Sequence, residues 1–183
     1  MRKLLTTAAA IAGLLAVLLW LAASLLPGQS LEYRSEVRIE LPAGQTWEKM
    51  KDLSCAHEYV PGVLRTEITT TARGGLGASR RVYSSDADFI NETAIEWHEG
   101  VGFTLDLHDG DGVAPAPFEA ASFRYELQPE GENASLVSTS LRFTLRGGAV
   151  GEWLGMTVLA GVFQDRVDAV SAGLKRYYEA GPL

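Results

Sequence analysis

The sequence predicts an α+β fold, in which an antiparallel sheet of about seven strands is followed by one long C-terminal helix and preceded by an apolar N-terminal helix. Three observations support it. Residues 4–26 carry no charge. Residues 33–146 contain short segments of alternating polar and apolar side chains, separated by glycine- and proline-rich turns. Residues 149–180 repeat apolar side chains at spacings of three and four. The 183 residues suffice for one domain.

The apolar run at residues 4–26 predicts a membrane anchor or uncleaved signal. As a helix it would extend roughly 35 Å, enough to cross a hydrocarbon core about 30 Å thick. Pro27 and Gly28 would end it. A cleaved secretory signal is the alternative, because Arg2 and Lys3 precede the run, although signal cores are shorter, about 7–15 residues. A helix within the core of the domain is a third interpretation.

The flanking basic residues favour residues 1–3 on the cytoplasmic side. We therefore expect a single-pass membrane protein with its main domain outside the cytoplasm, on the periplasmic side. Residues 27–34 would form a linker, and residues 35–182 would form the domain. The chain has a net charge of −7, and Arg2 and Lys3 are the only charged residues among the first 30, so residues 31–183 carry −9. An acidic domain argues against nucleic acid as a partner.

The strands are predicted from alternation and turn signals. The first covers residues 33–41, in which Val37, Ile39 and Leu41 share one face. Two short helices follow, one over residues 47–53 capped by Thr46 and one near residues 54–59. Six further strands are expected at 63–71, 78–84, 89–97, 101–108, 118–128 and 135–146. A single helix over 149–180, stopped by Gly181 and Pro182, would close the domain.

Several local motifs resemble those of the START/polyketide-cyclase-like (SRPBCC) superfamily. The opening strand and helix read EVRIELPAGQTWEKMKDL, Pro61-Gly62-Val63 matches a PGV motif, and Gly75-x-Gly77-x-x-Arg80 matches a GxGxxR hairpin. The resemblance covers about residues 35–182. It implies a helix-grip fold, in which a curved sheet wraps around the C-terminal helix and leaves an apolar cavity. The family often has a tryptophan before PGV, near the mouth of the cavity, where this chain has Tyr59.

The candidate ligand contacts are mainly aromatic side chains that would line this cavity or simply fill the core. Arg80 would either bind a ligand carboxylate or phosphate, because its guanidinium is a planar fork of donors, or pair outward with an acidic neighbour. The candidates are Tyr59, Arg80, Tyr83, Trp97, Phe103, Tyr125, Phe143, Trp153 and Phe163.

Other chemistry is not favoured. Cys55 is the only cysteine, so no intrachain disulfide forms. His57, His98 and His108 lack metal-ligand spacing, and no nucleotide, zinc or hydrolase motif is present. We therefore predict no catalytic residue, metal or cofactor.

The favoured hypothesis is a membrane-tethered module that binds an apolar small molecule or lipid between the sheet and the C-terminal helix. The alternatives are a cyclase- or dehydratase-like enzyme and an adaptor for another membrane protein. The enzyme is disfavoured because the predicted inner face is apolar, apart from Tyr83, Tyr125 and Thr139.

Overall fold

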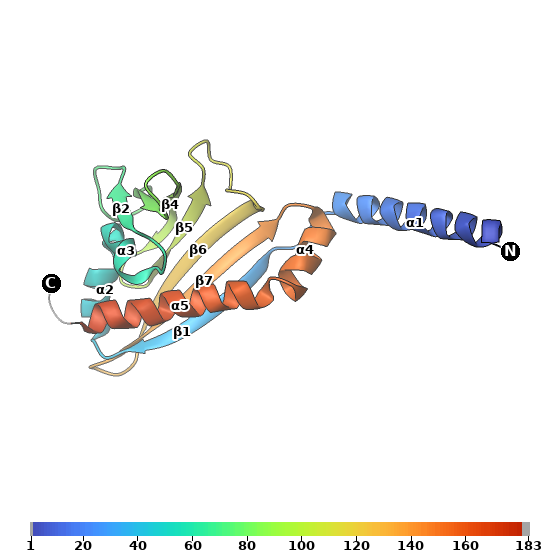
Figure 1. Cartoon of the computed structure of the whole chain (residues 1–183). Helices are drawn as coiled ribbons and strands as arrows, with labels where there is room; N and C mark the ends of the chain where they lie inside the picture. Colours follow the sequence, from blue (N-terminus) through green and yellow to red (C-terminus); the bar gives the residue numbers. More distant parts are fainter. Residues whose placement is uncertain (1, 181–183) are drawn as a thin grey trace.

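The structure, a computed structural model, describes residues 2–180, with side chains described from residue 13 onward. The predicted α+β fold is confirmed (Figure 1). One seven-stranded antiparallel sheet has the order β1-β7-β6-β5-β4-β3-β2. Its strands are β1 Leu31–Ile39, β2 Arg65–Ile68, β3 Ser79–Tyr83, β4 Phe89–His98, β5 Gly102–His108, β6 Phe118–Pro129 and β7 Ser135–Leu145.

The helices lie before, between and after the strands. They are α1 Arg2–Leu25, α2 Ala43–Met50, the 3-10 turn η1 Leu53–Cys55, α3 Ala56–Tyr59, α4 Gly148–Thr157 and α5 Ala160–Glu179. Helix α5 lies along the concave face of the sheet, mainly over β1 and β7 (Figure 1). We call this concave face the inner face. The short helices α2, η1 and α3 cover it near the C-terminal end of α5.

Helix α3 and helix α5 approach each other closely because position 173 is glycine. A Cβ atom there would lie 2.0 Å from the backbone oxygen of Tyr59. No side chain fits at that separation without moving the backbone. This close approach holds Tyr59 over the inner face, where it joins the main core cluster with Val170 and Leu174 of α5.

The prediction of a single C-terminal helix is wrong, because the chain breaks between α4 and α5. Helix α4 buries Gly151 and Gly155 against the sheet. A Cβ atom at Gly155 would meet Leu31 at 2.5 Å and Leu145 at 3.1 Å. The buried stripe of α4 therefore consists of glycines, whereas Trp153, predicted to face the core, is 56% exposed.

Smaller corrections concern element boundaries. Helix α2 begins at Ala43 rather than after Thr46, and Thr46 lies buried inside it with its hydroxyl 2.8 Å from that of Ser135. Strand β2 is shorter than the predicted 63–71, and β1 starts at Leu31, inside the predicted linker. The predicted helix stop at 181–182 lies outside the described residues.

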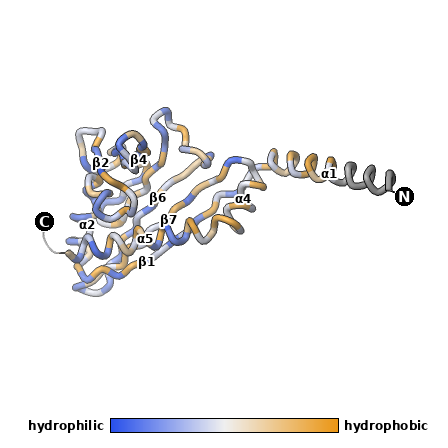
Figure 2. Tube along the Cα trace, in the orientation of Figure 1, coloured by the Kyte–Doolittle hydropathy of each residue, from blue (hydrophilic) through white to orange (hydrophobic). Residues whose placement is uncertain are grey.

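The prediction of a single-pass membrane protein is wrong. Within the part of the chain that the structure describes, no helix combines the length and the apolar character needed to cross a membrane. The side chains of α1 are described for residues 13–25. The predicted periplasmic location depended on such a span and falls with it. Figure 2 shows this coloured, largely apolar part of α1 projecting away from the sheet.

Candidate functional site

An arginine–glutamate ion pair lies on the inner face of the sheet. Arg80 of β3 and Glu92 of β4 are directly paired across the two strands. The Nε and Nη2 atoms of Arg80 lie 2.7 and 2.6 Å from Oε2 of Glu92. Nη1 donates to the backbone oxygen of Leu53 at 2.9 Å and to the hydroxyl of Tyr59 at 3.2 Å. The arginine side chain is only 1% exposed, so its charge is compensated entirely by these groups.

Tyrosine hydroxyls surround this pair. Tyr59, Tyr125 and Tyr178 are all buried, and the first two rings meet edge to face at 6.4 Å. Burial raises the pKa of Tyr125 and of Tyr178 well above the ordinary value, so both phenols stay protonated. Burial alone would lower the pKa of Arg80, but Glu92 and the neighbouring tyrosines raise it well above its ordinary value. The cluster therefore consists of the Arg80–Glu92 ion pair surrounded by protonated phenols.

One end of the inner face is filled by aromatic rings. Trp97 stacks on Phe103 with ring centroids 4.9 Å apart, and Phe103 meets Tyr125 at 5.0 Å. Glu99, in the turn after β4, accepts hydrogen bonds from the indole N–H groups of Trp47 at 2.7 Å and Trp97 at 3.0 Å. These two bonds lower the pKa of Glu99. We call Trp47, Trp97, Phe103 and Glu99 the closed end.

The other end of the inner face is not completely covered. Its apolar side chains from β4, β5, β6 and α5 are half-buried, and α5 packs mainly on β1 and β7. We call this set the inner apolar patch. It consists of Ile90, Leu107, Phe118, Phe123 and Phe163.

Two surface pockets lie outside the inner face. One, of about 420 Å³, adjoins the closed end and is lined by Trp97, Glu99 and the charged residues Glu48, Lys51, Asp52 and Arg73. The other, of about 300 Å³, lies between α1 and α4 and is lined by Trp20, Trp153 and small apolar residues. The first is open and mostly charged, which suits an apolar ligand poorly.

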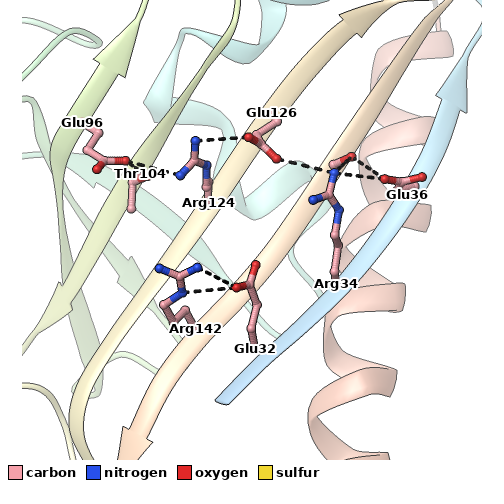
Figure 3. A network of polar contacts seen from close by, with 9 residues as sticks. Glu32, Arg34, Glu36, Glu96, Thr104, Arg124, Glu126 and Arg142 are labelled. Atoms are coloured by element: carbon pink, nitrogen blue, oxygen red, sulfur yellow. Dashed lines mark hydrogen bonds and ion pairs between the residues drawn. The ribbon is translucent and has the colours of Figure 1, made fainter. Parts of the chain in front are cut away.

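The outer face of the sheet carries a ladder of ion pairs (Figure 3). Arg142 donates through Nη2 and Nε to one oxygen of Glu32 at 2.7 and 3.2 Å. Further pairs join Arg34 to Glu36 and Glu126, and Arg124 to Glu126 and Glu96. The hydrogen bond from Arg142 lowers the pKa of Glu32, which is otherwise partly desolvated. These side chains are largely exposed, so the ladder resembles an ordinary solvated sheet surface.

The structure brings most of the predicted site residues together, but not all. Tyr59, Arg80, Trp97, Phe103 and Tyr125 form one connected group on the inner face.

Phe143 and Phe163 contact each other at 4.3 Å at the α4 end of the same face. Tyr83 instead lies on the outer face, where Arg65 stacks over its ring and its hydroxyl donates to Glu67 at 2.7 Å. Trp153 is exposed on α4. Arg80 has an acidic partner, as one interpretation expected, but it points inward.

Sequence reasoning missed Glu92, Trp47 and Glu99 as site residues. Glu92 was not selected as a candidate, although its two-residue alternation with Ala94 places it on the inner face. Trp47 was predicted to lie in a short helix, but the sequence analysis did not assign which side of that helix is buried. For Glu99, no signal in the sequence indicates that a turn residue would accept from two indoles. Among the residues that the structure describes, no group of three His, Cys, Asp or Glu side chains could hold a metal ion.

The architecture defines a helix-grip protein with a polar cluster inside an aromatic interior. The chain belongs to the family described as polyketide cyclase / dehydrase and lipid transport, whose sequence model matches residues 30–179. This confirms the superfamily predicted from the sequence. No curated protein sequence matches the chain.

Solved structures share the fold at low sequence identity. Norcoclaurine synthase from Thalictrum flavum, in complex with dopamine and hydroxybenzaldehyde, is 11% identical with a TM-score of 0.62, over 85% of this chain and 90% of that one. The Zhui aromatase/cyclase from Streptomyces sp. R1128 is 14% identical with a TM-score of 0.57, over 85% and 100%. Ara h 8.0201 is 13% identical with a TM-score of 0.61, over 84% and 100%. At such identities these likenesses show the fold alone.

Proposed function

We propose that the protein binds an apolar small molecule on the inner face, over the inner apolar patch. The observation that carries this proposal is that the apolar side chains of the patch pack against the core but remain only half-buried. Apolar side chains in a protein interior normally pack against other side chains with few voids. A ligand that covered Leu107 and Phe123 would remove this area from water, which favours binding at roughly 25 cal/mol per Å².

The surroundings of the patch support the same class of ligand. The ring centroids of Phe118 and Phe163 lie 6.1 Å apart, and both rings contact the ring of Phe143. Flat apolar molecules stack well on such rings. The family name includes lipid transport, and one structural neighbour carries two aromatic compounds. The family name agrees with an apolar ligand, and the two aromatic compounds agree with a ligand that is at least partly planar.

The proposal is tested by titrating the full chain with the neutral apolar dye Nile red and following its fluorescence. Phe123→Asn places a polar amide in the patch and removes an aromatic surface. Burial of such a side chain is worth roughly 1.5–3 kcal/mol, so we expect the Kd to rise about tenfold or more.

Trp153→Asn is the matched control, because it removes an aromatic ring from the other apolar surface, beside Trp20. We expect it to leave the inner-face affinity unchanged. If Trp153→Asn abolishes dye binding and Phe123→Asn does not, the ligand site lies between α1 and α4 and the proposal is wrong. Native mass spectrometry of the purified chain would then show whether a co-purified molecule follows the same pattern.

A further inference from the structure

Glu92 presents an unused carboxylate oxygen at the edge of the inner apolar patch. Both contacts from Arg80 go to Oε2. Across the described part of the chain, no hydrogen bond to Oε1 is found. The Glu92 side chain is 13% exposed, whereas that of Arg80 is 1% exposed. Oε1 is not among the buried side-chain atoms that lack a partner in the described residues, so this unpaired oxygen is accessible to solvent.

The neighbours of Glu92 belong to the patch. Leu107 of β5 is its direct cross-strand partner, and Ile90 lies two residues earlier on the same face of β4. A molecule that covers these two side chains comes within reach of the carboxylate. Covering Oε1 without giving it a donor would leave a desolvated acceptor unpaired, which is costly. The ligand is therefore selected for a hydrogen-bond donor at this point.

The charge of the pair decides what kind of donor fits. Arg80 already neutralises Glu92, so a ligand cation gains less here than at an isolated carboxylate. A ligand anion would approach the negative oxygen. It could not reach Arg80, because that side chain is only 1% exposed and four of its five N–H groups already donate to Glu92, Leu53 and Tyr59. A neutral hydroxyl matches the site.

We infer that Oε1 of Glu92 determines specificity, and that it selects apolar ligands bearing a neutral hydroxyl over ethers and carboxylates of the same shape. This inference rests on the proposed function and names the chemical class of its ligand. It also argues against the expectation that Arg80 binds a ligand carboxylate or phosphate.

Three probes of nearly equal shape test it by isothermal titration of the full chain: 2-naphthol, 2-methoxynaphthalene and 2-naphthoate. One net hydrogen bond is worth about 1 kcal/mol, so we expect 2-naphthol to bind roughly five- to tenfold tighter than the ether. The carboxylate should bind weakest. Equal affinities for naphthol and ether, or tightest binding of naphthoate, would overturn the inference.

The variant Glu92→Gln sharpens the test. Its carbonyl oxygen can still accept from Arg80, which leaves the amide N–H group facing the ligand. We expect the preference for naphthol over the ether to disappear or reverse. Glu96→Gln is the matched control, because Glu96 lies on the same strand but contacts Thr104 and Arg124 on the outer face. It should keep the wild-type preference.

The outcomes separate this inference from the proposed function. If the ether and naphthol bind equally and both are lost in Phe123→Asn, the binding site stands and the role of Glu92 is wrong. If no probe binds the wild-type chain, both fail. Should Glu92→Gln not fold, the three-probe comparison on the wild-type chain still decides the question.

Discussion

The two faces of the sheet use the same chemistry in opposite settings. On the inner face, Arg80 and Glu92 form one pair that is almost completely removed from water. On the outer face, Arg142 and Glu32 form a pair with a similar shortest distance, 2.7 Å, but their side chains are 61% and 38% exposed. Distance alone therefore does not distinguish them. Burial does, because it changes both the strength of the attraction and the cost of losing one partner.

The comparison teaches that the two pairs have different roles. An exposed pair is screened by water and salt, and it can be broken at little cost. A buried pair fixes the surrounding groups, since each unpaired charge would remain in a medium of low dielectric constant. Arg80 also donates hydrogen bonds to the carbonyl of Leu53 and the hydroxyl of Tyr59. It thereby links β3 to η1 and α3, whereas Arg142 links only neighbouring strands.

The largest effect is expected from Arg80→Met. This change leaves Glu92 as an unpaired, mostly buried carboxylate and removes the donors to Leu53 and Tyr59. The free energy of unfolding should fall by roughly 3–5 kcal/mol, measured by urea denaturation of the full chain. A loss below about 1 kcal/mol would show that the inner pair behaves like an exposed one.

The double variant Arg80→Met with Glu92→Met is the control for that measurement. Apolar replacement of both partners avoids the unpaired charge, so part of the lost stability should return. Additive losses in the two single variants would contradict this explanation.

Tyr59→Phe should have a smaller effect. It removes the hydroxyl that accepts from Nη1 of Arg80 and leaves that buried donor unpaired, at a cost of about 1–3 kcal/mol. Thermal and urea unfolding measure it. Tyr33→Phe is a suitable comparison, because the hydroxyl of Tyr33 donates to the backbone oxygen of Gly155 from a less buried position.

Arg142→Met should cost only about 0.2–1 kcal/mol, as is usual for exposed pairs. The same urea experiment, repeated at high salt, should show an even smaller difference from wild type, because salt screens exposed charges. A loss as large as that of Arg80→Met would remove the distinction between the two faces.

The smallest effect concerns pH. The pKa of Glu32 is lowered below its ordinary value of 4.5, chiefly by the hydrogen bond from Arg142. Its contribution is therefore complete above pH 4.5 and is lost as the pH falls through the pKa of the folded state. The stability difference between wild type and Glu32→Gln should shrink over this acidic range in a urea series. A stability difference that grows on acidification would contradict a lowered pKa of Glu32.

The fold was largely predictable because alternation and turns are local signals. Strands β3 to β7 appear within a few residues of their predicted positions. The break between α4 and α5 was not predictable from the apolar stripe, since that stripe assumes large side chains face the sheet. Here Gly151 and Gly155 face it, and small residues give no signal in an apolar pattern.

The site was predictable only in part. Aromatic residues such as Phe103 and Tyr125 are correctly placed by the alternation of their strands. Tyr83 was misplaced because a partly apolar strand can be assigned to either face, and a shift of one residue exchanges the faces. The inward position of Arg80 conflicts with the usual exposure of arginine. Only its partner Glu92, at a matching register on the next strand, explains it.

The open sheet leaves β1 and β2 as its edges. Unpaired edge strands can recruit strands from other molecules and so promote aggregation. Strand β2 is only four residues long, and β1 alternates Glu32, Arg34, Glu36 and Arg38 on its outer face while α5 packs against it. An outer ladder that adds little to the folding free energy thus acts when two copies meet. Its charges make the exposed edge a poor template for a strand from another molecule.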